Sequence, residues 1–204
     1  MGFYELSLSK HIAQLAHQPG GLLVDVGANA GYFSCLWAAL NMQNRCMAFE
    51  ASPRNQKMLN DNIALAGFST RIEVQNCAVG RTVGQMNFDL GPEDQTGWGG
   101  LAHTASEKSL SVDVKPLDEL VSDEANITVL KIDTEGADAW VLEGAERLLR
   151  ERRIKHVFYE CNGPRMARLE IEATRPHTFL ADCGYRVHPL TKSRHNTEFH
   201  AMPA

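Results

Sequence analysis

Residues 24–50 read VDVGANAGYFSCLWAALNMQNRCMAFE, and this stretch decides the fold. Leu22 to Val26 is a short apolar run interrupted only by Asp25, which is typical of a parallel strand covered on both faces. A glycine turn follows, and the apolar residues of the segment 33–40 then recur at helical spacing. Arg45 to Glu50 is predicted to form a second strand. The stretch therefore predicts a strand, a tight turn, a helix and a second strand.

The same alternation continues along the chain. Ser52 stands at the N-cap position of a second helix, with Pro53 at its first residue and Gly67 as its stop. One more helix is predicted around Val141, Ala145 and Leu148. Further strands are predicted over residues 71–78, 127–133 and 156–161. Strands that alternate with helices indicate an α/β fold with a doubly wound sheet and right-handed crossovers.

The pattern changes between the third and fourth predicted strands. Gly84 to Leu90 and Ser109 to Val114 resemble exposed strands on either side of the loop GPEDQTGWGGLAHTASEK, residues 91–108. Residues 84–114 are therefore predicted to form a hairpin-like insertion with a mobile, glycine-rich lid.

Each end of the chain has its own pattern. Residues 1–20 are predicted to form an amphipathic N-terminal helix that ends before the Pro19-Gly20-Gly21 turn. Near the other end, residues 178–183 are predicted to be helical, with short strands over 185–188 and 197–201.

Composition limits the class of protein. The chain has 204 residues, 44% apolar and 22% charged, as expected of a single domain spanning 1–204. The net charge is −5 and the basic residues are scattered, so we expect no nucleic-acid partner. No apolar run approaches the roughly 20 residues of a membrane span, and the opening residues lack a signal-peptide layout. The five widely spaced cysteines fit reduced core thiols. A cytoplasmic protein with no membrane span is expected.

The turn after the first strand has the features of a cofactor cradle. Gly27 and Gly31 allow a sharp turn and close backbone approach. Glu50 lies 19 residues after Gly31, near the roughly 20-residue offset at which a carboxylate accepts the hydroxyls of a ribose. Asn29 occupies the place of the second glycine of a dinucleotide fingerprint, and no phosphate loop is present. Asp25 suits a cationic amino group. The sequence thus predicts a ribose-bearing cofactor without a pyrophosphate.

Three blocks of sequence resemble the FkbM-type methyltransferases: VDVGANAGYFS (24–34), AFEASPRNQKMLNDNIALAG (48–67) and LKIDTEGADAWVLEGA (130–145). The segment SVDVKPLDEL (111–120) precedes the last block. The resemblance implies a Rossmann-like class I methyltransferase sheet of about seven strands, the last antiparallel. It also implies S-adenosyl-L-methionine as cofactor and methylation of a hydroxyl on a sugar, glycan or secondary metabolite.

By this resemblance, Asp25, Gly27, Asn29 and Gly31 would line the methionyl and ribose parts of the cofactor, and Glu50 would hold the ribose hydroxyls. Asn76, Cys77 and Ala78 would flank the adenine. The whole set expected to bind the cofactor is Asp25, Gly27, Ala28, Asn29, Gly31, Tyr32, Phe33, Glu50, Ala51, Ser52, Asn76, Cys77, Ala78 and Asp133.

Candidate catalytic residues follow the later strands. An aliphatic hydroxyl is a weak nucleophile, so a base that removes its proton during attack would help. Asp133, Glu135 and Glu160 are candidate bases, and Asp133 could instead cap a helix or hold the cofactor. The same three carboxylates could bind a cation such as Mg²⁺, although no metal is expected. His103 in the glycine-rich loop is a fourth candidate, with Trp98 available to stack on a sugar face.

Two alternatives stay open. A nucleic-acid methyltransferase that modifies amino groups needs an (N/D)PP(Y/F) element after the fourth strand, where this chain reads Asp133-Thr134-Glu135-Gly136. A non-catalytic module could keep the cofactor cradle and lack an acceptor site. Lys131, within the fourth strand, is interpreted as a residue at the flank of the sheet or in an ion pair, and not as a catalyst. The acceptor and the oligomeric state are not predicted.

Overall fold

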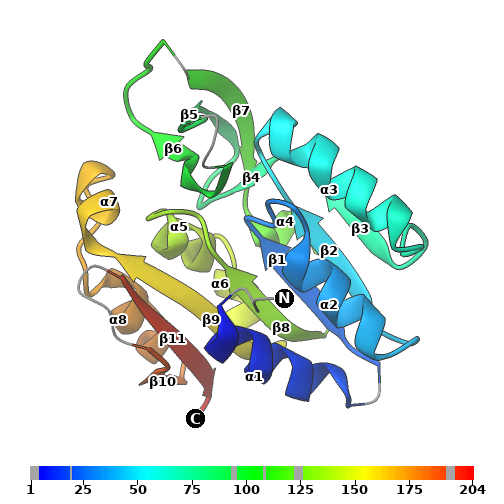
Figure 1. The fold of residues 1–204 in the computed structure, drawn as a ribbon. Coiled ribbons are helices and arrows are strands. Elements are labelled where there is room, and N and C mark those ends of the chain that lie inside the picture. Colours follow the sequence, from blue (N-terminus) through cyan, green and yellow to red (C-terminus); the bar gives the residue numbers. More distant parts are fainter. Residues whose placement is uncertain (1–4, 19, 93–95, 108, 122–125, 192–195) are drawn as a thin grey trace.

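The computed structural model describes residues 5–18, 20–92, 96–107, 109–121, 126–191 and 196–204, without the side chains of Thr96 and Asn196. A seven-stranded sheet in the order β10-β11-β9-β8-β1-β2-β3 forms the centre of the molecule (Figure 1). Its strands are β1 (Leu22–Val26), β2 (Arg45–Phe49), β3 (Ile72–Gln75), β8 (Ile127–Ile132), β9 (Ile154–Asn162), β10 (Tyr185–Pro189) and β11 (Asn196–Pro203).

The strand directions confirm the predicted doubly wound sheet. β1 pairs in parallel with β2 and β8, and β3 and β9 extend the parallel pairing on the two sides. The last strand, β11, is antiparallel to both of its neighbours, β9 and β10. From β1 the chain first continues to β2 and β3 on one side and later to β8 and β9 on the other, so the strand order reverses at β1. A sheet of this kind binds ligands at the carboxyl ends of the strands where the order reverses.

Helices cover both faces of this sheet and bury its apolar side chains. One core lies under α1 (Leu6–Ala16), α2 (Tyr32–Leu40) and α3 (Pro53–Leu65). The opposite core lies under α4 (Leu117–Leu120), α5 (Asp138–Glu143), α6 (Glu146–Arg150) and α8 (Arg175–Asp182). Alternate residues of β1 enter the two cores, with Leu23 on one side and Val24 on the other. No helix among the described residues is both long and apolar enough to cross a bilayer.

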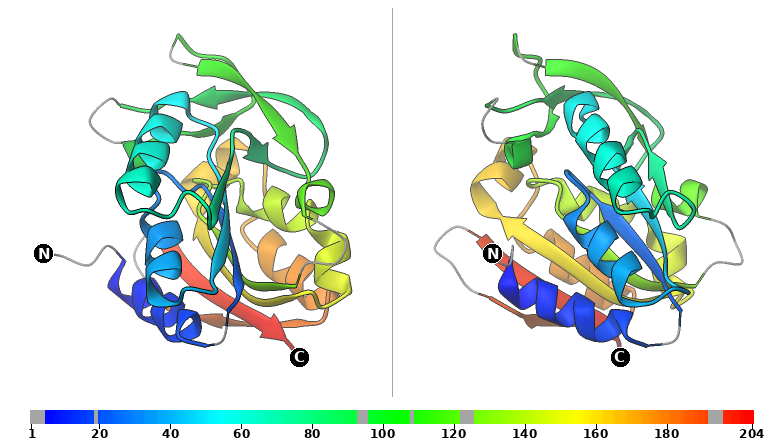
Figure 2. Two further views of the ribbon diagram at one scale, coloured as in Figure 1. Left: turned by 90° about the vertical axis from the view of Figure 1, so that its right-hand side faces the viewer. Right: turned by 45° about the vertical axis from the view of Figure 1, so that its right-hand side comes forward.

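A smaller four-stranded sheet, in the order β4-β7-β5-β6, lies at the end of the molecule drawn at the top of Figures 1 and 2. It contains β4 (Ala78–Val79), β5 (Gly84–Asp89), β6 (Gly100–Ala102) and β7 (Ser109–Lys115), and the short helix η1 (Thr96–Trp98) precedes β6. β5 and β7 pair antiparallel along their length, as predicted for a hairpin-like insertion. Residues 93–95 and 108 of the predicted lid lie outside the described residues, and the movement of a lid stays a prediction.

Two predicted elements are divided. The strand predicted over 71–78 is wrong as one element, because β3 ends at Gln75 and Ala78 pairs with β7 in the smaller sheet. The helix predicted around Val141 to Leu148 is interrupted at Gly144, where a Cβ atom would lie 2.0 Å from the Gly80 carbonyl oxygen. Sequence patterns missed β6, α4 and α7 (Gly163–Arg168), which are all short.

Candidate active site

A cavity lies where β1, β2 and β8 end, beneath the smaller sheet; we call it the strand-end cavity. It holds about 590 Å³ of space not filled by atoms, part of it open to solvent. Its lining is Val26, Gly27, Asn29, Phe49, Glu50, Ala51, Asn55, Cys77, Ala78, Val79, Phe88, Gly97, Gly99, Leu101, Asp133, Thr134 and Glu135. The two sheets therefore share one cavity.

The turn after β1 needs glycine at its first position. Gly27 has φ 75°, and a Cβ there would lie 1.9 Å from the carbonyl oxygen of Asp133. The amides of Gly27 and Ala28 both donate to the Phe49 carbonyl at 3.0 Å, which ties the turn to the end of β2. Asn29 adopts the left-handed conformation, with φ 50°, which asparagine tolerates better than most residues. The turn is thus held open toward the cavity by backbone contacts.

Glu50 and Asn29 present fixed polar atoms to the cavity. The Glu50 carboxylate accepts hydrogen bonds from the amides of Asn29 and Ser52, one on each oxygen, both at 2.8 Å. Burial raises the pKa of Glu50, and these two amides oppose the rise. The Asn29 Oδ1 atom is buried and has no hydrogen-bond partner among the described residues. A buried acceptor of this kind suits a ligand that donates a hydrogen bond.

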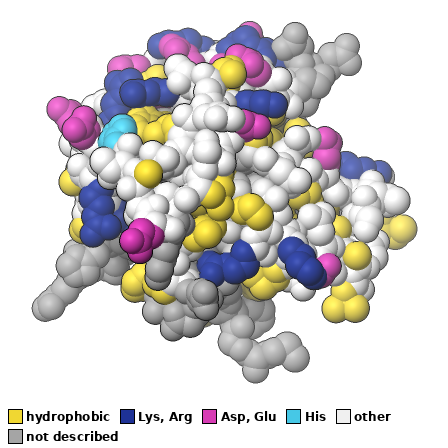
Figure 3. Space-filling view, turned by 90° about the horizontal axis from the view of Figure 1, so that it is seen from above, with side chains coloured by type: hydrophobic (Ala, Val, Ile, Leu, Met, Phe, Trp, Pro, Cys, Tyr) yellow, Lys and Arg dark blue, Asp and Glu magenta, His cyan; other side chains and the backbone are white. Residues whose placement is uncertain are grey.

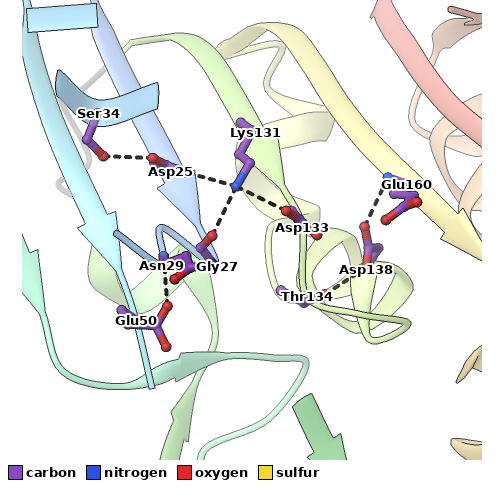
Figure 4. A network of polar contacts seen from close by, with 10 residues as sticks. All are labelled: Asp25, Gly27, Asn29, Ser34, Glu50, Lys131, Asp133, Thr134, Asp138 and Glu160. Atoms are coloured by element: carbon purple, nitrogen blue, oxygen red, sulfur yellow. Dashed lines mark hydrogen bonds and ion pairs between the residues drawn. The ribbon is translucent and has the colours of Figure 1, made fainter. Parts of the chain in front are cut away.

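Lys131 lies behind the turn and links β8 to β1 (Figure 4). Its Nζ atom is 3.1 Å from Asp25 Oδ1 and 3.7 Å from Asp133 Oδ2, and donates to the Gly27 carbonyl at 3.0 Å. Burial alone lowers the pKa of Lys131, but the carboxylates of Asp25 and Asp133 more than compensate and raise it. Lys131 is therefore a permanent internal cation, as its predicted ion pairing requires.

Asp25 has a different position from the one expected of a ligand contact. It is fully buried, accepts a hydrogen bond from the Ser34 hydroxyl at 2.7 Å, and does not line the strand-end cavity. Alternation along β1 explains this, because Asp25 points to the α2 side of the sheet. The cation that Asp25 faces is Lys131.

The other expected cofactor residues divide into two groups. Gly27, Asn29, Glu50, Ala51, Cys77, Ala78 and Asp133 line the cavity. The lining does not include Asp25, Ala28, Gly31, Tyr32, Phe33, Ser52 or Asn76. Gly31 shapes the turn, since its φ of 84° favours glycine, and a Cβ there would lie 2.5 Å from Leu59 Cδ1. Ser52 holds Glu50 through its amide, and its hydroxyl makes no cap hydrogen bond. Phe33 is buried in the core and Asn76 is exposed.

Residues that sequence patterns missed complete the lining. Phe49 could have been found, because it immediately precedes Glu50 at the end of the same strand. Phe88, Gly97, Gly99 and Leu101 carried no comparable signal, since they reach the cavity only through the path of the insertion.

Glu135 lies on the loop between β8 and α5, with φ 56°. Its Oε2 atom is 3.1 Å from Arg165 Nε and accepts a longer hydrogen bond, 3.4 Å, from Asn162 Nδ2. Burial raises the pKa of Glu135 to about 7, with Asp133 and Asp138 adding to the rise and Arg165 opposing it. A carboxyl group that titrates near neutral pH suits a general base.

Two further carboxyl groups flank this loop (Figure 4). Asp138, which sequence patterns missed, is buried, and its carboxylate accepts hydrogen bonds from the Thr134 hydroxyl (2.7 Å) and the Glu160 amide (3.1 Å). Burial raises its pKa to about 6. The pKa of Glu160 rises to about 8, because of burial and the neighbouring Asp133 and Asp138. Glu160 lines a separate cavity beside α1, together with Asp133, and not the strand-end cavity.

A third hollow, the insertion groove, runs between the insertion and α7. It is lined by Asp89, Gly91, Pro92, Trp98, Gly100, Leu101, Ala102, His103, Thr104, Ser106, Glu135, Arg165, Arg168, Leu169 and Glu170. Glu135 and Leu101 belong to both this groove and the strand-end cavity. On the face seen from above in Figure 3, basic and acidic side chains lie next to one another and hydrophobic ones between them.

His103 and Trp98 lie in the insertion groove and not in the strand-end cavity. The His103 ring packs edge-on against Trp140, and its Nε2 atom is 3.2 Å from the Leu169 carbonyl. Because a carbonyl only accepts, Nε2 carries the proton and Nδ1 is the basic atom. Trp98 is 55% exposed, so its ring is available to a ligand. His103 stays a candidate base.

No three His, Cys, Asp or Glu side chains of the described residues are grouped so that they could hold a metal ion. Asp133, Glu135 and Glu160 therefore do not form the magnesium site considered above.

Residues 25–187 match the model of the methyltransferase FkbM domain. The chain belongs to this family. Among curated proteins, the FkbM domain described here is similar to methyltransferase sdnD of Sordaria araneosa, at 26% identity over 216 residues, which cover 90% of this chain and 81% of that protein.

Solved structures of methyltransferases share the fold of this FkbM domain. A precorrin-6y C5,15-methyltransferase from Geobacter metallireducens GS-15 superposes with a TM-score of 0.59 at 13% identity, covering 99% of this chain and 90% of that chain. An O-methyltransferase from Bacillus cereus in complex with SAH (S-adenosyl-homocysteine) gives 0.56 at 12% identity, covering 98% and 81%. Their names specify different methylated positions, so the shared fold does not identify the acceptor.

Proposed function

We propose that this protein transfers a methyl group from S-adenosylmethionine to a hydroxyl oxygen of a small-molecule acceptor, a sugar, glycan or secondary metabolite. The position of Glu135 carries the proposal, because this carboxyl group, which titrates near neutral pH, lines both the strand-end cavity and the insertion groove. A base at the junction of two hollows can act on an acceptor in one while the methyl donor occupies the other.

The strand-end cavity fits the proposed cofactor. Glu50 would hold the ribose hydroxyls, and the buried Asn29 Oδ1 atom would accept a hydrogen bond from the methionyl part. Phe49 and the segment 77–79 offer apolar surface to the adenine. Gly27 lies so close to the Asp133 carbonyl that no side chain fits there, which leaves the turn backbone accessible to the cofactor. When bound, S-adenosylmethionine supplies an electrophilic methyl carbon.

The chain's own residues would position the acceptor and remove its proton. Arg165 and Asn162 both contact the Oε2 atom of Glu135, so among the described residues Oε1 is the oxygen left to receive the hydroxyl proton. Lys131 fixes Asp133 and the Gly27 turn relative to each other through one ammonium group. Such fixed geometry contributes much of the rate in a displacement that needs alignment of donor and acceptor.

The insertion would belong to the same single domain, and it would cover the site. Gly97, Gly99 and Leu101 form one wall of the strand-end cavity, and exclusion of water by this wall would protect the reacting groups. The acceptor would lie in the insertion groove, with Trp98 against a ring face.

The test combines cofactor binding with methyl transfer. Calorimetry with S-adenosylmethionine and S-adenosylhomocysteine measures binding, and transfer of a labelled methyl group is then assayed on sugars, hydroxylated metabolites and tRNA. Binding with transfer to a hydroxylated small molecule supports the proposal. Binding without transfer to any substrate indicates a non-catalytic module, transfer to tRNA alone indicates a nucleic-acid enzyme, and no binding refutes the cofactor.

Three variants assign the base. Glu135→Gln should lower kcat by about 100-fold or more while cofactor affinity stays unchanged, because general-base catalysis contributes roughly 10²–10⁴-fold. Glu143→Gln is the matched control and should keep full activity, because Glu143 ends α5, pairs with Arg175 of α8 and lines neither the strand-end cavity nor the insertion groove. If His103→Gln and not Glu135→Gln abolishes transfer, His103 is the base.

A further inference from the structure

Arg165, on α7, joins three parts of the site. Its Nη1 and Nη2 atoms both donate to the Trp98 carbonyl at 3.1 Å, so a forked guanidinium holds the backbone of the insertion. Its Nε atom is 3.1 Å from Glu135 Oε2. The Arg165 side chain is 25% exposed and that of Glu135 is 18% exposed, so the ion pair lies largely out of water. One side chain therefore links α7, the insertion and the proposed base.

These three segments pack closely against one another. Gly136 has φ 105°, and a Cβ there would lie 2.7 Å from Arg165 Cβ. A Cβ at Gly100 would lie 3.5 Å from Glu135 Cβ and 3.7 Å from Arg165 Nη1. The loop that carries Glu135 is thus packed directly against α7, with the insertion against both. The position of Arg165 is set by backbone packing as well as by charge.

More acidic than basic groups surround Glu135. Asp133 at the end of β8, Asp138 on α5 and Glu160 on β9 are carboxyl groups that interact with it. Among the described residues that act on Glu135 electrostatically, Arg165 is the cation. Without it, three carboxyl groups would oppose the ionisation of Glu135. An opposite charge within about 4–6 Å favours the charged form of a carboxyl group.

We propose that Arg165 is a positioning residue for methyl transfer, which keeps Glu135 in its basic form and ties it to the insertion through the Trp98 carbonyl. The inference rests on the proposed function, in which Glu135 is the base. The proposal implies that Glu135 is fully ionised only when the insertion is in contact with α7. Arg165 would then link closure of the site to readiness for proton removal.

The first test is the pH dependence of kcat/KM. In Arg165→Met, Glu135 should hold its proton to a pH about one unit higher, at the low end of the effect of a lost ion pair. The ionised fraction at pH 7 then falls from about one half to about one eleventh, which lowers kcat/KM about fivefold at pH 7, and this part of the loss recovers near pH 9. Arg165→Lys keeps the charge and should keep the profile, but with a raised KM because the fork to Trp98 is lost.

The matched control is Arg150→Met, which removes an exposed Arg–Glu ion pair of 2.7 Å on α6 and should leave the profile unchanged. In a Glu135→Gln background, Arg165→Met should still raise KM, because the fork to Trp98 is lost, but it should lower kcat little further, because the effect through Glu135 is already gone. An unmoved profile in Arg165→Met, or full additivity of the two substitutions in kcat, would overturn the proposal.

The second test needs no acceptor. Carbon-13 NMR of labelled glutamate carboxyl groups, with the Glu135 signal assigned by its loss in Glu135→Gln, should show a titration midpoint about one unit higher in Arg165→Met. Hydrogen exchange at the amides of residues 99–102 should be faster in this variant, because the contact to Trp98 is lost. Equal midpoints and equal exchange would refute the role of Arg165. Absence of methyl transfer by the unaltered protein would refute the proposed function and leave this titration interpretable.

Discussion

Replacement of Lys131 by methionine removes the only charge that faces Asp25 in the contacts the structure describes. Asp25 is fully buried, and Lys131 is 3% exposed at 3.1 Å from it. Methionine has a similar length and keeps the packing against the Phe33 ring, over which the ammonium now lies at 5.4 Å. The substitution therefore tests charge and not volume.

The expected loss can be worked out from these contacts. Removal of one partner from a buried ion pair costs about 3–5 kcal/mol, because the other charge stays buried without compensation. The Gly27 carbonyl also loses its donor, which adds about 1 kcal/mol. Asp133 contributes little, since it is 27% exposed and water can solvate it. In Asp25→Asn/Lys131→Met the uncompensated charge is gone, so the loss should shrink to about 1–2 kcal/mol.

Urea unfolding at pH 7 measures these differences. Lys57→Met is the control, because the pair of Lys57 with Asp61 is exposed and contributes little to stability. Since the folded pKa of Lys131 is raised, its stabilisation is complete below the unfolded value near 10.4 and is lost only as pH rises through the folded value. The difference between the two proteins should thus be constant from pH 6 to pH 9. A loss below about 1 kcal/mol in Lys131→Met, or a double variant as unstable as the single one, would refute this account.

Three further predictions concern the turn, the ribose contact and the histidines. Gly27→Ala should abolish binding of S-adenosylhomocysteine by calorimetry and lower the melting temperature, because the added Cβ overlaps the Asp133 carbonyl at 1.9 Å; retained affinity would contradict this. Glu50→Gln should weaken the same binding about tenfold or more without loss of the fold, since an amide accepts less strongly than a carboxylate and its NH₂ group would face the Asn29 or Ser52 amide; circular dichroism is the control. Burial, with His156, lowers the pKa of His200 to about 4, so its effect on stability is absent above about pH 6.5 and grows as pH falls toward 4. Relative to His200→Asn, the unaltered protein should lose about 1–2 kcal/mol over that interval after allowance for the half-exposed ring, and parallel stability curves would exclude the effect.

Most of the fold could be predicted from local pattern. β1 has the predicted bounds, and β2, β8 and β9 differ from prediction by one or two residues at an end. These strands are buried on both faces, so their apolar runs are continuous and easily found. The division of the predicted strand 71–78 could not be found in this way. Ala78 is as apolar as its neighbours, and only its pairing with Val114 assigns it to the smaller sheet.

By itself the sequence determined the order of strands and helices, the glycine turn and the carboxylate of Glu50, since each depends on residues near one another in the chain. Tertiary structure decided which side chains reach the cavity. Asp25 and Asn29 belong to one motif, yet the pleat of β1 turns Asp25 inward to Lys131 and the left-handed turn brings Asn29 to the cavity wall. Tertiary structure also decided the pKa of Glu135, because this pKa depends on burial and on the charge of Arg165. Arg165 lies 30 residues away in sequence, and its Nε atom lies 3.1 Å from Glu135 Oε2. Charge and burial act through distance in space, which no spacing along the chain specifies.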